Sequence, residues 1–255
     1  MVRPHVHIPY AKIGEHLDFI IRNNIDLEIY FSSDSLDVLS SDDIRSLKNK
    51  LQHEPELSFH APFMDLCPGA VDSGVRDITV GRFNQVLDIA GILNPLSIVM
   101  HSGYDKWKYG LNPQLWLDKS LETWIPINAR AESMGVKLAI ENIFEDEPSN
   151  LVMLMEAMGS ENFGICFDTG HCNLFSRVPL EEWIRCLKAH IIELHLHDND
   201  KGSDQHRPIG DGTFNFEWFF NEIKDISCVY TIEAHTPEDA LKGMERLAYH
   251  LSRTD

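Results

Sequence analysis

Eight short runs of aliphatic and β-branched residues recur along the chain, separated by longer segments whose apolar positions have helical spacing. The runs start at His5, Ile25, Leu57, Leu96, Val136, Phe163, Ile191 and Cys228. Short apolar runs of this kind between turn signals are typical of buried strands. Eight alternations of strand and helix in 255 residues predict an α/β fold, a single parallel (β/α)8 TIM barrel over residues 1–255.

The rival architecture is an open, doubly wound sheet, which usually has fewer strands and a glycine-rich turn after its first strand. The first run is followed here by "IPYAKIGEH", which contains one glycine, so the barrel is favoured. Helix starts also have the expected chemistry. Ser41 is predicted as an N-cap, and Pro113 and Pro237 occupy first helical positions after Asn112 and Thr236.

Polar residues alternate with aliphatic ones near the ends of the predicted strands. In "LHLH", His195 and His197 face away from Leu194 and Leu196. The same alternation places further acids and imidazoles on the corresponding face: His60, His101, Glu141, Asp168 and Glu233. In a barrel, the aliphatic face packs on the helices and the other face points inward. Active sites of such barrels lie at the carboxyl ends of the strands, where these residues gather.

This convergence indicates a metal site at the C-terminal face of the barrel. One histidine or one carboxylate at a strand end would be a weak signal, because such residues are usually satisfied structurally. Six of the eight predicted strands, however, bring an acid or imidazole to the same end. Burying so many ionisable groups without partners would cost several kcal/mol each. Neutral imidazole and carboxylate are ligands of divalent ions, which offset that cost.

Composition narrows the setting. The hydrophobic fraction of 43% and charged fraction of 24% are those of an ordinary soluble protein. The formal net charge of −18 disfavours nucleic acid as a partner, because nucleic-acid-binding proteins usually present a basic face. The five cysteines are scattered and form no CxxC pair, which predicts a reducing, cytoplasmic environment. No apolar run is long enough to span a membrane, so no membrane partner is expected.

Seven motifs together resemble the xylose isomerase-like TIM barrel superfamily: "FHAP", "MHSG", "AIEN", "FDTGH", "LHLHD", "DQHRPIGDG" and "TIEAH". They cover most of the chain. This superfamily includes sugar and sugar-phosphate isomerases and epimerases. It also includes the endonuclease IV-type apurinic-site nucleases, which form AP endonuclease family 2.

The resemblance implies a set of metal ligands. Epimerase-like members hold one divalent ion (Zn, Mn, Co or Mg) with four residues that correspond to Glu141, Asp168, His195 and Glu233. In the nuclease branch these four are joined by two further zinc ions, three in all. The additional ligands correspond to His60 and His101 with a bridging Glu141, and to His171, Asp204 and His206. In "LHLHD" the ligand is assigned to His195, three residues before an aspartate, and His197 is a second candidate.

The first functional hypothesis is a metal-dependent sugar or sugar-phosphate isomerase or epimerase. Glu141 and Glu233 would act as base and acid on an enediolate, since one carboxyl can be ionised while the other is protonated. His171 would then bind a substrate oxygen, and Asp204 and His206 would belong to a loop that closes over the substrate. Further candidates for substrate contact are Arg207, Lys201 or Lys106 for a phosphate, and Trp107 for stacking on a sugar ring.

The alternative is a zinc-dependent, endonuclease IV-like phosphodiesterase at abasic DNA sites, or a related hydrolase of small phosphoesters. A metal-dependent lyase or dehydratase stays open as a third class, because barrel scaffolds change function readily. A nuclease must grip the DNA backbone with basic residues. The strong negative charge therefore favours the isomerase or epimerase, acting on a small sugar or sugar phosphate.

Overall fold

The computed structural model describes residues 3–253. Eight parallel strands close into a barrel in chain order, with β1 pairing to both β2 and β8. The strands are β1 His5–Pro9, β2 Asp26–Tyr30, β3 Leu57–His60, β4 Ser97–His101, β5 Lys137–Glu141, β6 Phe163–Asp168, β7 Ile191–Leu196 and β8 Val229–Ile232. Each lies within one of the eight apolar runs. The predicted (β/α)8 barrel is confirmed, and the closed sheet excludes the open alternative.

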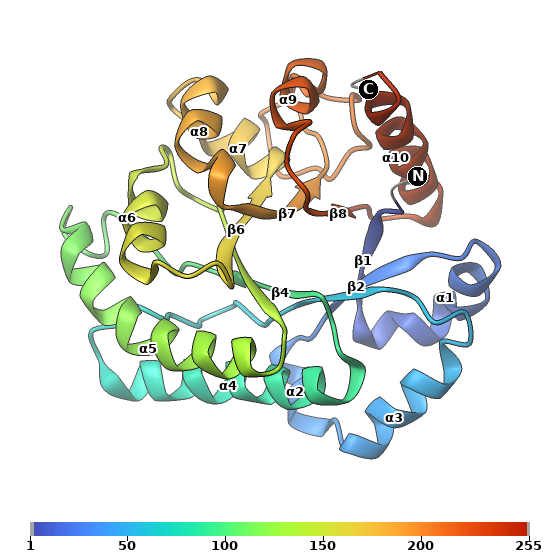
Figure 1. Ribbon diagram of the computed structural model, residues 1–255, viewed down its shortest axis with the longest axis horizontal. Coiled ribbons are helices and arrows are strands. Elements are labelled where there is room, and N and C mark those ends of the chain that lie inside the picture. The colour runs from blue at the N-terminus through green and yellow to red at the C-terminus, as the bar shows by residue number, and fades with distance from the viewer. Residues whose placement is uncertain (1–2, 254–255) are drawn as a thin grey trace.

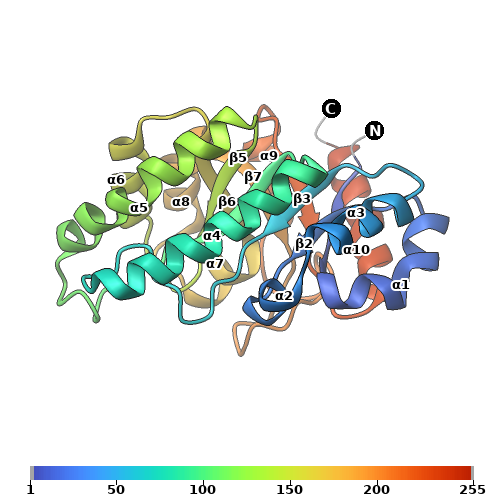
Figure 2. The ribbon, with the colours of Figure 1, turned by 90° about the horizontal axis from the view of Figure 1, so that it is seen from below.

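Helices follow the strands and surround the barrel (Figure 1). They are α1 Tyr10–Arg22, α2 Ser33–Val38, α3 Ser41–Lys50, α4 Ser73–Leu93, α5 Pro113–Ser133, α6 Ser149–Met158, α7 Thr169–Phe175, α8 Leu180–Leu187, α9 Phe216–Ile223 and α10 Pro237–Leu251, with a 3-10 turn η1 Lys188–His190. The two 21-residue helices α4 and α5 pack side by side along one flank (Figure 2). Within residues 3–253, no helix combines the length and apolar character that a membrane span requires.

Two of the three predicted helix starts are confirmed. The side chains of Asn112 and Thr236 accept hydrogen bonds from the third helical residue of α5 and α10, each directly before a proline. The prediction for α3 is wrong by one residue, because Ser40 is the cap and Ser41 begins the helix. A capping box needs an acceptor three residues after the cap, and Asp43 provides it for Ser40.

The alternation of the strands separates two environments. The aliphatic residues of the outward face, such as Ile140, Phe167 and Leu194, join the main hydrophobic core beneath the helices. Inside the barrel, the buried apolar cluster is small: Val99, Ala139 and Cys166. The rest of the interior is largely polar, so the barrel centre depends on hydrogen bonds as well as on packing.

Glu193 illustrates how the interior polar groups are satisfied. Its carboxyl accepts hydrogen bonds from Ser97 Oγ at 2.6 Å and from Thr231 Oγ1 at 2.9 Å. Burial and the nearby charge of Glu28, partly offset by His195, together raise its pKa to about 8. Glu193 is therefore mainly protonated at neutral pH, and it lies deeper in the barrel than the carboxylates at the strand ends.

The segment after β7 is organised around Asp198. This fully buried carboxylate accepts hydrogen bonds from the backbone N–H groups of five residues: Asn199, Gly210, Gly212, Thr213 and Phe214. Asp198 also forms an antiparallel bridge with Arg207. A side chain at Gly212 would collide with the Asp198 carboxylate and the Asn199 carbonyl, so only glycine fits there. One aspartate thus fixes the loop that carries Asp204 and His206.

We expect Asp198→Ala to lower the free energy of unfolding by about 3 kcal/mol or more, because it strands several buried N–H donors at once. Urea denaturation followed by circular dichroism measures this change. Asp200→Ala is the matched control. Asp200 lies in the same loop but is exposed and pairs with Arg207, so its removal should lower the free energy of unfolding far less than the removal of Asp198 does. Equal costs for the two variants would contradict the anchoring role of Asp198.

Candidate metal centre

Four strand ends bring a compact set of donors together at the carboxyl end of the barrel. Nδ1 of His195 lies 3.6 Å from Glu141 Oε1, 3.7 Å from Asp168 Oδ2 and 3.5 Å from Glu233 Oε1. These separations are too long for hydrogen bonds. Four ligand atoms placed tetrahedrally about 2.1 Å from one ion lie about 3.4 Å apart. Each of the three carboxylates therefore lies from His195 Nδ1 at the separation expected between two ligands of one divalent ion.

His195 is oriented for this role by Glu28. Nε2 of His195 lies 3.0 Å from Glu28 Oε2. In a neutral imidazole whose Nε2 proton is donated to that carboxylate, Nδ1 would offer its lone pair to the centre. Burial raises the pKa of Glu28, but the charges and hydrogen bonds of His195 and His7 together outweigh it and hold that pKa well below its ordinary value. Nδ1 of His195 is buried and has no hydrogen-bond partner within residues 3–253. A carboxylate behind a histidine is the usual support for a metal ligand.

The second oxygen of Glu141 faces two more histidines. Glu141 Oε2 lies 3.1 Å from His60 Nε2 and 3.2 Å from His101 Nε2. These three donors form one of the groups whose spacing suits a metal ion. The geometry is consistent with Glu141 bridging two positions, as the resemblance implied.

Another predicted group gathers beside the Asp198 loop. Asp204 Oδ2 lies 3.4 Å from His171 Nε2 and 3.0 Å from His206 Nε2. Nδ1 of His171 also lies 3.0 Å from Glu141 Oε1 and 3.3 Å from Asp168 Oδ2. His206 adopts a left-handed backbone conformation with φ of 47°, which costs energy for a non-glycine residue. All nine proposed ligands thus lie in one continuous cluster.

His197 makes more contacts within the donor cluster than its place as a second candidate ligand suggested. Its Nε2 lies 3.1 Å from both oxygens of Asp168 and 3.4 Å from Glu233 Oε2, and its ring stacks on His206 at 4.1 Å. Its fully buried ring occupies the space above Gly170, where any side chain would collide with it. His195 meets three carboxylates at ligand spacing, whereas His197 lies against Asp168 at hydrogen-bond distance. His197 also belongs to two groups whose spacing suits a metal ion, one with Asp168 and His171 and one with His206 and Glu233, so the assignment to His195 stays a prediction.

His7 and Glu28 also belong to the cluster, although the sequence pattern assigned them no role. Nδ1 of His7 lies 2.7 Å from Glu28 Oε1 and 3.5 Å from Glu233 Oε1. Glu28 therefore connects His7 to His195. The alternation in "HVHIP" and "DLEIY" could have placed both residues inside the barrel. It could not distinguish a residue that binds the metal from one that hydrogen-bonds to a metal ligand.

Neighbouring charges decide the ionisation of the cluster. Burial raises the pKa of Glu233, but His195 and His206 lower it to about 2 overall. Burial lowers the pKa of His206, yet the hydrogen bond to Asp204 raises it to about 9. The metal-free cluster therefore combines ionised carboxylates with protonated histidines near pH 7. Because an ion binds neutral imidazole, its binding must release protons.

A cavity of about 690 Å³ opens above the cluster. Its polar floor includes Glu141, His171 and Glu233, so the proposed acid, base and oxygen-binding residue all reach it. Lys201 lines a different pocket, beside Cys172 and Asn173.

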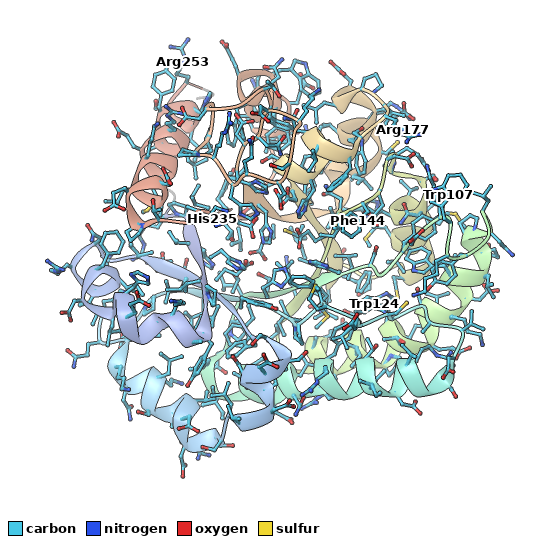
Figure 3. All side chains as sticks on the ribbon, turned by 180° about the vertical axis from the view of Figure 1, so that it is seen from behind. Trp107, Trp124, Phe144, Arg177, His235 and Arg253 are labelled. Atoms are coloured by element: carbon cyan, nitrogen blue, oxygen red, sulfur yellow. The ribbon has the colours of Figure 1, made fainter. Side chains whose placement is uncertain are left out.

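Other residues expected to contact substrate point elsewhere. Trp107 is 73% exposed and does not line the cavity. Figure 3 shows it at the edge of the molecule, whereas Phe144 lies closer to the middle. Arg207 also lies outside the cavity lining, and its guanidinium pairs with Asp200 at 2.8 Å.

Comparison with known proteins agrees with the barrel fold. A relative from Methanocaldococcus jannaschii, described as an uncharacterized protein, is 32% identical over 217 residues, covering 78% of this chain and 71% of its own. A solved structure described as a D-tagatose 3-epimerase-like protein is 28% identical, with a TM-score of 0.80 and 98% of each chain covered.

A protein from Thermus thermophilus, soaked with zinc chloride, is also 28% identical, with a TM-score of 0.81 over 97% of this chain and 98% of that one. The family model described as "Xylose isomerase-like TIM barrel" matches residues 25–250. The chain therefore belongs to the xylose isomerase-like TIM barrel family.

Proposed function

We propose that the protein is a divalent-metal-dependent isomerase or epimerase of small sugars. The observation that carries this proposal is the set of four donors around His195 Nδ1, which suits one ion at the floor of a substrate-sized cavity. Similarity to the D-tagatose 3-epimerase-like protein supports the sugar substrate class. The ion, held by Glu141, Asp168, His195 and Glu233, would be zinc, manganese, cobalt or magnesium.

The bound ion would polarise a substrate carbonyl and lower the cost of removing the neighbouring proton. Glu141 and Glu233 would move that proton. They come from different strands, β5 and the end of β8, and both reach the cavity. A sugar that lay between them would expose one face of its reacting carbon to each carboxyl group. The ionised carboxylate would remove a proton from one face, and the other carboxyl group, in its protonated form, would donate a proton to the opposite face.

The histidines around these carboxylates would control the proton transfer. Glu233 faces His7 through one oxygen and His197 and His206 through the other. Each imidazole stabilises the ionised carboxylate, which keeps Glu233 ready to accept a proton at neutral pH. His171 lines the cavity beside Glu141 and would hydrogen-bond a substrate oxygen.

We expect Glu233→Gln to reduce turnover by about 10² to 10⁴-fold, because the amide cannot exchange the proton. The assay incubates the metal-loaded enzyme with a panel of ketoses in D₂O and follows deuterium incorporation next to the carbonyl by NMR. Glu193→Gln is the matched control, because Glu193 is a buried carboxyl already protonated at neutral pH. It should keep most of the activity. Turnover without deuterium incorporation, or an active Glu233→Gln enzyme, would contradict the mechanism.

One observation favours a second candidate, an endonuclease IV-like phosphodiesterase or small-phosphoester hydrolase. His60 and His101 both face Glu141 Oε2, and Asp204 lies between His171 and His206. These are the additional donors that a three-zinc centre needs. The net charge of −18 opposes DNA binding, and so the isomerase or epimerase remains the primary proposal.

Metal content separates the two candidates. For the isomerase or epimerase, elemental analysis of protein purified without chelator should give one ion per chain, unchanged in His206→Ala. This variant removes a donor of the additional group and leaves the four central donors in place. Three zinc ions per chain, with a loss in His206→Ala and cleavage of abasic-site DNA by the parent, would instead establish the phosphodiesterase.

A further inference from the structure

The cavity above the metal centre has two unlike walls. Its floor carries the carboxylates and histidines described above. The facing surface is apolar and comes from segments after different strands: Tyr30, Phe63, Leu66, Ile143, Phe144 and Phe175. A volume of about 690 Å³ lies within the range of about 300–1,000 Å³ that encloses drug-sized ligands. A free pentose or hexose would fill only part of it.

The apolar wall is built from aromatic rings in contact. The Phe63 ring stacks on His101 at 4.2 Å and lies 5.7 Å from the Tyr30 ring. Phe144, which also lines the cavity, contacts Phe175 edge to face at 5.2 Å. Phe144 is nevertheless 71% exposed, in contrast to the core phenylalanines. An exposed ring at the mouth of a polar-floored cavity indicates a surface that a ligand covers.

The charges of the lining exclude a phosphate as the natural occupant of this wall. Among the described residues that line the cavity, six are acidic: Asp65, Asp105, Glu141, Glu145, Asp204 and Glu233. Lys108 is the only lysine or arginine among them, and its ammonium lies 3.1 Å from Cys67 Sγ and above the Tyr109 ring. A buried phosphate needs several paired cations.

Nearby cations are already paired with carboxylates. Lys106 forms an ion pair with Asp146, and Arg207 pairs with Asp200. Neither residue lines the cavity. Among the described residues of the lining, Lys108 is thus the one ammonium or guanidinium group that a phosphate on this wall could meet.

We propose that the substrate is an uncharged sugar that carries an apolar, aromatic-sized substituent. This inference rests on the proposed function, because the sugar end is placed at the metal centre. The hydroxyl and carbonyl groups face Glu141, Glu233 and His171, and the substituent covers the wall formed by Phe63 and Phe144. The substituent explains both the surplus volume and the exposure of Phe144.

Hydroxamates test the wall without knowledge of the sugar, because they anchor on a bound divalent ion. The metal-loaded protein is titrated calorimetrically with acetohydroxamate and with benzohydroxamate. The first carries a methyl group where the second carries a phenyl group. We expect benzohydroxamate to bind about tenfold more tightly or better, since the phenyl ring is buried against the wall. Phe144→Ala should remove most of that preference.

Trp107→Ala is the matched control for Phe144→Ala. Both side chains are exposed aromatics near the carboxyl end of the barrel, but only Phe144 lines the cavity (Figure 3). The benzohydroxamate preference should be unchanged in Trp107→Ala. A second pair of ligands, glycolohydroxamate and phosphoglycolohydroxamate, tests whether the cavity accepts a charged substrate. The phosphorylated ligand should bind several-fold more weakly than the unphosphorylated one.

The outcomes separate this inference from the function on which it rests. Acetohydroxamate binding without a gain from the phenyl group, or a gain that survives Phe144→Ala, would overturn the aromatic substituent and leave the metal-dependent function standing. Tighter binding of the phosphorylated hydroxamate would overturn the uncharged substrate. Failure of the protein to bind any divalent ion would remove the proposed function, and this inference with it.

Discussion

The site depends on the compensation of buried negative charge at the mouth of the barrel. Glu28, Glu141 and Asp168 are each at most 2% exposed, and Glu233 is 6% exposed. Each of the four faces at least one imidazole nitrogen within 3.7 Å. Unpaired carboxylates at such depth would cost several kcal/mol each. The histidines on neighbouring strands offset part of this cost, and an ion at the point where their lone pairs meet would offset more.

The scaffold and the site use separate parts of the sequence. Aliphatic residues on the outer face of each strand hold the helices, and the inner face is left for polar groups. Asp198 fixes the segment that carries Asp204 and His206 through backbone N–H groups, independently of any ligand. The loops after β3 and β5 supply Phe63 and Phe144, so this rim of the cavity is free to vary while the metal donors stay in place.

Much of this arrangement could be predicted from sequence. Short apolar runs located the eight strands, and alternation with a period of two placed Glu141, Asp168 and His195 on one inner face. Alternation alone could not show that His195 presents Nδ1 to the centre, because that depends on Glu28, a residue 167 positions away in sequence. Similarly, the position of the Trp107 side chain outside the cavity depends on how the loop after β4 packs, which the sequence pattern does not show. Ser40 and Ser41 were both possible caps of α3. Only Ser40 has Asp43 three residues later to complete a capping box, a spacing that the prediction of Ser41 did not take into account.

One divalent ion among four specific atoms is the feature on which the proposed chemistry depends. A crystal structure of the protein loaded with manganese or zinc, with anomalous diffraction at the metal edge, locates the ion directly. We predict a peak about 2.0–2.3 Å from His195 Nδ1 and from carboxylate oxygens of Glu141, Asp168 and Glu233. A fully loaded crystal with no peak at this position, or with His195 turned away from the ion, would contradict this arrangement.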